Sequence, residues 1–144
     1  MYHSIKRNFL VSLLIASLLI TLSSCSIFSL DLEKELPDEK VVSIVKVTVD
    51  EFGAETQVEL PEEKRQLFND YLKELKYTKR KNWFGIKMSI WDGEYFLINY
   101  ENHTVKFGEH HFVLRCKDEV IKSLKLDGVY PNETFKELFK LFDS

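Results

Sequence analysis

Histidines are the residues of this chain that most suggest a transition-metal site. Those in its C-terminal half are His103, His110 and His111. Zinc needs imidazole nitrogens about 2.1 Å from one centre. His110 and His111 are consecutive, so in a strand their side chains point to opposite faces, and His103 would lie about 13 Å along the sheet from the partner of His110. The sequence therefore predicts no metal site and no cofactor.

Catalytic nucleophiles have recognisable sequence surroundings, and the chain has none of them. There is no Gly-x-Ser-x-Gly elbow, no cysteine and histidine pair with a supporting signature, and no glycine-rich phosphate loop. The 23 acidic residues are scattered, so they do not identify an acid and base pair without geometry. We therefore expect no catalytic residues.

The N-terminal segment has the composition of an export signal. Lys6 and Arg7 precede the apolar run 9–21, and residues 9–30 carry no charge. Basic residues followed by an apolar run and then by small residues are typical of a secretory signal. The uncharged stretch is also long enough to cross a bilayer as a helix. In either case the rest of the chain would lie outside the cytoplasm, because Lys6 and Arg7 favour the inner side.

The residues Leu22-Ser23-Ser24-Cys25 end this segment and resemble the lipobox of bacterial lipoproteins. In that family the cysteine receives a diacylglyceryl group and becomes the mature N-terminus after signal-peptidase cleavage. The resemblance covers the first 25 residues. It implies a signal peptide over 1–24 and a lipid anchor on Cys25 at the extracytoplasmic face of the cell membrane. A secreted protein cut nearby and a spanning helix are the alternatives.

Without residues 1–24 the chain carries 18 basic and 23 acidic side chains, a net charge of -5. Mild acidity excludes the basic surface that nucleic-acid binding requires. Residues 25–40 combine five acidic side chains, two lysines and Pro37 without a sustained period. We expect a lipid-anchored acidic tether there, reaching at most about 50 Å, before a single domain over 41–144. Cys116 would then lack an intramolecular partner, and we expect a buried thiol.

The sequence of the first half of the domain predicts a hairpin and a helix. We expect two strands, Val41–Val49 and about Glu55–Leu60. A four-residue loop between them would pair Val47 with Val58, which places the apolar side chains of both strands on the same face. Pro61 suits a first helical position. The apolar stripe of this helix contains Leu67, Phe68, Tyr71, Leu72 and Leu75, and the lysines expected at its end are Lys73, Lys76 and Lys79.

Ile86–Arg115 predicts an antiparallel meander of four strands. Its turn signals are Asp92-Gly93, Glu101-Asn102 and Gly108-Glu109, and a three-residue loop ending at Gly93 would pair Ile90 with Glu94. The expected core face contains Ile86, Met88, Ile90, Phe96, Ile98, Tyr100, Val105, Phe107, Phe112 and Leu114.

After the meander, Asp118–Leu126 could form a short helix or a strand, with Gly128 just beyond a helix end. Asn132 is expected to cap a final helix that buries Phe135, Leu138, Phe139 and Phe142. The expected fold is α+β, with an antiparallel sheet of about six strands (hairpin, helix, four-strand meander) and two or three helices on one face. This order resembles small uncharacterised lipoproteins with a compact α+β domain.

Two surfaces are candidates for binding. The sheet face opposite the core would present Trp91, Tyr95, Leu97, Thr104, Lys106, His111, Val113 and Arg115, which is more aromatic than a solvated face requires. A basic and aromatic segment, suited to an anionic lipid surface or a wall polymer, contains Lys76, Tyr77, Lys79, Arg80, Lys81, Trp83 and Phe84.

These features predict a lipid-anchored module of the cell envelope that binds a protein or an envelope polymer. An inhibitor or immunity-type lipoprotein would be one form of it. The alternatives are an envelope hydrolase whose carboxylates meet only in the fold and a structural spacer. A cleft where acids converge would favour the hydrolase, and an exposed patch would favour binding.

Overall fold

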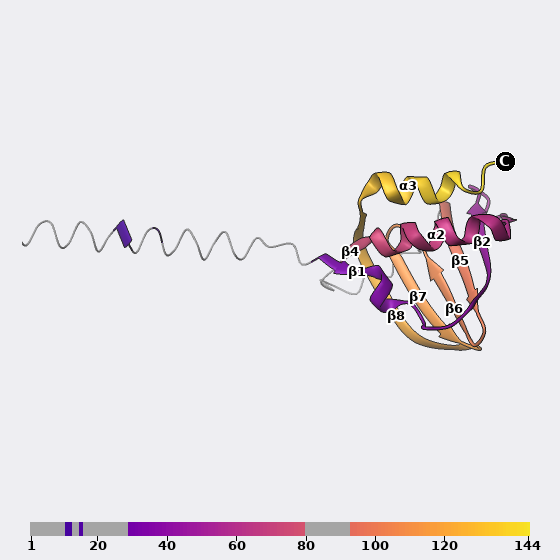
Figure 1. The fold of residues 1–144 in the computed structure, drawn as a ribbon, viewed down its shortest axis with the longest axis horizontal. Helices are drawn as coiled ribbons and strands as arrows, with labels where there is room; N and C mark the ends of the chain where they lie inside the picture. The colour runs from indigo at the N-terminus through magenta and orange to yellow at the C-terminus, as the bar shows by residue number, and fades with distance from the viewer. Residues whose placement is uncertain (1–10, 13–14, 16–28, 80–92) are drawn as a thin grey trace, which may run out of the picture.

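The computed structural model describes residues 11–12, 15, 29–79 and 93–144. These residues form one antiparallel sheet of eight strands with two α-helices on one face (Figure 1). The strand order is β1-β4-β8-β7-β6-β5-β2-β3. The strands are β1 Ser29–Asp31, β2 Val41–Val49, β3 Glu55–Glu59, β4 Lys76–Lys79, β5 Gly93–Tyr100, β6 His103–Phe107, β7 His111–Cys116 and β8 Glu119–Tyr130. The helices are the 3-10 helix η1 Leu32–Glu35, α2 Glu62–Glu74 and α3 Asn132–Lys140.

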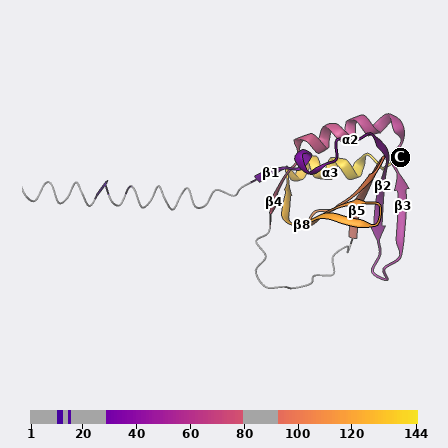
Figure 2. The ribbon, with the colours of Figure 1, turned by 90° about the horizontal axis from the view of Figure 1, so that it is seen from below.

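The predicted α+β architecture is confirmed, but the sheet is wider than expected. Strands β1, β4 and β8 are additions to the predicted set. The segment 118–126, which could have been helix or strand, belongs to β8, and Gly128 lies inside that strand opposite Thr78. Figure 2 shows α2 and α3 along the same side of the sheet, with β1 and β3 at opposite edges.

Phenylalanine side chains between the sheet and the helices form the centre of the core. Phe96 of β5 is fully buried, and its ring centroid lies 4.4 Å from that of Phe139 and 5.2 Å from that of Phe68. The predicted core face of the meander is confirmed for its described members. Buried residues on that face are Phe96, Ile98, Tyr100, Val105, Phe107 and Phe112, and Leu114 is half-buried against them.

The helix boundaries differ slightly from prediction. Pro61 precedes α2 in the cap position instead of opening the helix, and Leu67 of the predicted stripe is 43% exposed. Pro131 occupies the cap position of α3, so Asn132 does not have the expected capping role. Lys73 lies in the last turn of α2 as expected, whereas Lys76 and Lys79 belong to β4, which begins directly after the C-cap residue Leu75.

The predicted register of the first hairpin is wrong. Val47 lies opposite Gln57, and the loop contains five residues instead of four. The Asp50 carboxylate closes that loop by accepting hydrogen bonds from the N–H groups of Phe52 and Ala54, and Gly53 has a φ of +82°. The observed register directs Ile44 and Leu60 into the core, where both are buried, and the Leu60 N–H donates to the Ile44 carbonyl.

The neighbours of β5 differ from the expected meander. Strand β5 lies between β2 and β6, so β2 occupies the side on which Ile86–Ile90 was expected to pair. Ile86, Met88 and Ile90 themselves lie outside the described residues. The Glu101-Asn102 turn is confirmed. The next turn is Glu109-His110, one residue later than expected. It also contains two residues, so the same side chains remain on the core face.

The acidic tether expected over 25–40 is not observed for residues 29–40. Strand β1 pairs with β4, and Leu32 of η1 is fully buried with its N–H donating to the Leu75 carbonyl at 3.1 Å. Glu39 accepts hydrogen bonds from the Asn102 N–H at 2.9 Å and is 2.7 Å from His103 Nδ1. Burial raises the pKa of Tyr100 to about 12, with a contribution from the Glu39 charge. This segment is therefore part of the folded domain.

Glu35 connects η1 to two strands. Its carboxylate accepts a hydrogen bond from the Tyr77 hydroxyl of β4 at 2.7 Å and another from the Lys122 ammonium of β8. Burial by itself would raise the pKa of Glu35, but these hydrogen bonds and the charges of Lys122 and Lys79 hold the pKa below its ordinary value. Burial and the same carboxylate raise the pKa of Tyr77.

We expect Glu35→Gln to lower the free energy of unfolding at pH 7 by about 1.5–3 kcal/mol, the usual range for hydrogen bonds to a charged group. Because the folded-state pKa is depressed, the ionised carboxylate stabilises the fold above its unfolded pKa, and this contribution is lost as the pH falls through the folded pKa. The difference between wild type and variant should shrink below about pH 4. Urea titrations at pH 7 and pH 3 measure the difference in the free energy of unfolding, with the exposed Glu33→Gln as control. An equal loss at pH 3 and pH 7 would contradict this assignment.

Candidate functional site

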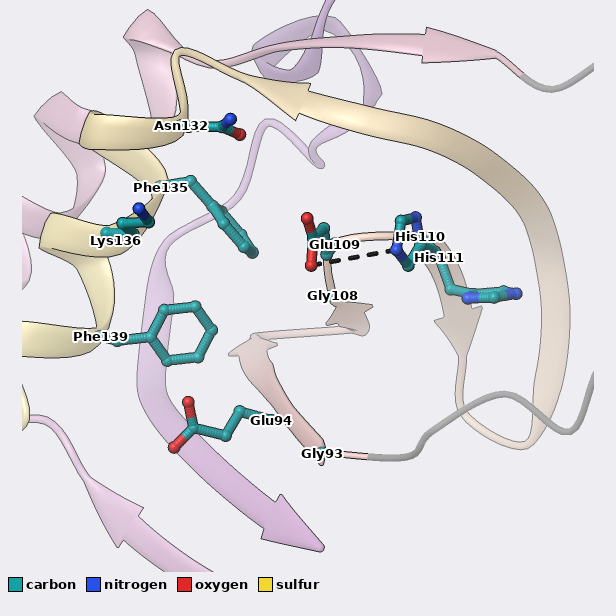
Figure 3. A pocket seen from close by; sticks show the side chains of 10 residues that line it. All are labelled: Gly93, Glu94, Gly108, Glu109, His110, His111, Asn132, Phe135, Lys136 and Phe139. Atoms are coloured by element: carbon teal, nitrogen blue, oxygen red, sulfur yellow. Dashed lines mark ion pairs between the residues drawn. The ribbon is translucent and has the colours of Figure 1, made fainter.

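A cleft of about 560 Å³ lies between α3 and the ends of the central strands. Phe135, Lys136 and Phe139 line it from α3, Glu94 lines it from β5, and Glu109 and His110 line it from the β6–β7 turn. We call it the α3 cleft. Figure 3 shows the two phenylalanine rings directed into it, with the Glu94 and Glu109 carboxylates at separate positions along its wall. Its volume falls in the range of small-ligand sites, about 300–1,000 Å³.

The charges of the α3 cleft lie at its rim. Glu109 and His110 are 3.9 Å apart, with side chains 60% and 58% exposed. Such an exposed pair contributes little to stability and leaves both groups accessible to a ligand. Glu94 and Lys136 are also exposed, whereas Phe135 is buried. The arrangement suits a ligand that places an apolar group against the phenylalanine rings and a cationic group beside a carboxylate.

The described lining of the α3 cleft contains no serine, threonine or cysteine. Among the described residues, the carboxyl groups with a displaced pKa are those of Glu35 and Glu39, and neither lines the cleft. The cleft thus combines an apolar wall with exposed charged side chains, among them the carboxylates of Glu94 and Glu109. Sequence reasoning missed it because its wall comes from three segments that the fold alone brings together.

No family model matches the chain, and no curated protein or solved structure is similar enough to it to count as a match. Its function must therefore be argued from its own residues. Among the described residues, no helix has both the length and the apolar character needed to span a membrane.

The sheet face opposite the core is not the exposed aromatic surface that the sequence predicted. Tyr95 is on that face but only 5% exposed, and Leu97 is half-buried. The Lys106 ammonium lies 4.2 Å from the Tyr95 ring centroid, and the Tyr95 hydroxyl is 3.3 Å from a Glu55 carboxylate oxygen. Burial raises the pKa of Tyr95 and lowers that of Lys106. Tyr95 is therefore a packed residue, and Trp91 lies outside the described residues.

The basic and aromatic segment divides between two environments. Lys76 and Lys79 are exposed on β4, whereas Tyr77 between them is buried, with 1% of its surface exposed. Tyr77 is thus a core residue and not part of a binding surface. The other members of the segment, Arg80, Lys81, Trp83 and Phe84, lie outside the described residues.

The metal-binding residue types are dispersed in the fold. No group of three or more histidine, cysteine, aspartate and glutamate side chains within 29–79 and 93–144 could hold an ion. Cys116 ends β7 and is half-buried, more accessible than the buried thiol that we expected. Cys25 lies outside the described residues.

Proposed function

We propose that this protein is a bacterial lipoprotein whose folded domain binds a partner outside the cytoplasm through the α3 cleft. The leader and the sequence Leu22-Ser23-Ser24-Cys25 support export and acylation of Cys25. The observation that carries the binding role is the cleft itself, which combines a phenylalanine wall with exposed charged groups. A binding role is favoured over a carboxylate hydrolase because the two carboxylates of the cleft, those of Glu94 and Glu109, lie at separate positions along its wall and do not converge.

The partner proposed for the α3 cleft is a protein segment or an envelope polymer that carries an apolar group next to a cationic one. Phe135 and Phe139 would receive the apolar group. Glu94 would attract the cation, because it is exposed and the hydrogen bond that its carboxylate accepts from the Thr48 hydroxyl is long, at 3.5 Å. Charge complementarity of this kind selects partners more than it adds affinity.

Photo-crosslinking in intact cells tests this proposal. A crosslinking amino acid at Lys136 should capture a partner, and the same group at Glu63 on α2 serves as the matched control, since both positions are exposed. Adding Glu94→Lys should reduce capture at residue 136 about tenfold, which corresponds to about 1.4 kcal/mol. Equal capture at residues 136 and 63, or capture that does not respond to Glu94→Lys, would contradict binding in the cleft.

A further inference from the structure

We infer that the sheet edge formed by β1 and β4 lies against the anionic headgroups of the membrane that holds the lipid anchor. The inference rests on the proposed acylation of Cys25. It departs from the sequence-based expectation, in which an extended tether would hold the domain clear of the headgroups.

The connection between Cys25 and the sheet is short. The sheet begins at Ser29, and only three residues separate Ser29 from Cys25. Four Cα–Cα steps span at most about 14 Å even when fully extended. An acylated Cys25 sits at the membrane surface, so the start of β1 must lie within that distance of the headgroups.

Strand β1 is firmly attached to the domain. Its three residues pair with β4 in the order Ser29 to Thr78, Leu30 to Tyr77 and Asp31 to Lys76. The next residue, Leu32, is fully buried. Separating β1 from the sheet to lengthen the connection would break this pairing and expose Leu32. The domain itself must therefore approach the membrane.

The edge formed by β1 and β4 presents basic, aromatic and apolar side chains. Lys76 and Lys79 are exposed on β4, and Tyr130, opposite Lys76 on β8, is 45% exposed. Leu30 on the outermost strand is 42% exposed. The neighbouring Asp31 carboxylate is 3.3 Å from the Lys34 ammonium, which offsets its charge. Lysine, tyrosine and an exposed leucine are the residue types that favour an anionic membrane interface.

The opposite edge of the sheet provides an internal control. Phe52, in the turn between β2 and β3, is 87% exposed, and β3 is the last strand in the order that begins with β1. Seven strand spacings of about 4.8 Å place β3 up to about 34 Å from β1 along the sheet. An exposed aromatic residue there should remain away from the headgroups.

Photo-crosslinking in cells grown with a palmitate analogue and labelled phospholipid tests this orientation. A crosslinking amino acid at Leu30 should form phospholipid adducts severalfold more often than the same group at Phe52. The exposed Ser29 serves as a second probe position if the Leu30 variant does not fold. The double variant Lys76→Glu, Lys79→Glu should reduce phospholipid adducts at residue 30 by about fivefold or more for each lysine. A basic residue near an anionic surface increases membrane affinity by about a factor of five. Inserting ten Gly and Ser residues after Ser26 should also reduce them.

The palmitate label separates failure of this inference from failure of the proposed function. Label on every variant, together with equal phospholipid adducts at residues 30 and 52, would overturn the orientation and leave the lipoprotein proposal intact. Crosslinks between two copies at Leu30, in place of lipid adducts, would overturn it in favour of self-pairing at the edge strand. Absence of the label from the wild-type protein would overturn both.

Discussion

Cys25→Ala should abolish incorporation of a palmitate analogue and leave residues 1–24 attached. Acylation needs the Cys25 thiol, and in the lipoproteins that this leader resembles, cleavage follows acylation at the same residue. The loss of label should be essentially complete, because the sequence has only one other cysteine, Cys116, which ends a strand of the folded domain. In-gel detection of the label, together with the size of the immunoprecipitated protein, measures both effects.

Cys116→Ala is the matched control for this experiment. It removes the other thiol, and it should leave both label and size unchanged. Label that persists in Cys25→Ala would contradict acylation at Cys25. A wild-type protein without label would favour one of the alternatives, with an uncut chain indicating a spanning helix and a shortened chain indicating a secreted protein.

Leu32→Ala should destabilise the folded domain by about 2–5 kcal/mol, the usual cost of truncating a fully buried leucine. Leu32 is fully buried in η1 and belongs to the main hydrophobic core. It lies between β1 and Glu35, so its truncation should also weaken the attachment of β1 to β4. Urea denaturation followed by circular dichroism gives the change in the free energy of unfolding.

Leu30→Ala is the control for Leu32→Ala, since Leu30 is 42% exposed two residues earlier in the same segment. Its effect should be well under half of that of Leu32→Ala. If residues 25–40 were a solvated tether, neither substitution would change stability. A Leu32→Ala domain as stable as the wild type would therefore contradict the assignment of residues 29–36 to the fold.

Residue periodicity was sufficient to predict the main body of the domain. Phe96, Phe107 and Phe112 lie on one face because strand residues alternate and because the loops between those strands have even lengths. The turn after Phe107 lies one residue later than predicted, which shifts the pairing of β6 with β7 by two residues. Because side chains alternate along a strand, a shift of two residues leaves the same side chains on the core face.

Periodicity was misleading in the first hairpin. The valines at 45, 47 and 49 suggested the buried face of β2, but Ile44 faces the helices, and Lys46 of the same face has its ammonium 5.8 Å from the Phe142 ring centroid. Every residue of β3 is exposed, so the apolar pattern of that strand did not determine the register. The buried pair Ile44 and Leu60 determined it.

The edge strands and the α3 cleft could not be predicted from local patterns. Strands β1 and β4 have three and four residues, too short for a measurable period, and they pair across more than 40 residues of sequence. Charged residues in η1 suggested a solvated tether, whereas Glu35 is held by Tyr77 and Lys122 from distant strands. The α3 cleft depends on the same kind of long-range contact.

The most direct test of the account is the mass of the mature protein, purified from membranes of cells that express the full chain. The account predicts a polypeptide that begins at Cys25 and carries a diacylglyceryl group on that cysteine, so tandem mass spectrometry should place the added mass on the N-terminal peptide. A mature chain that begins at any other residue, or an N-terminal Cys25 without lipid, would contradict it.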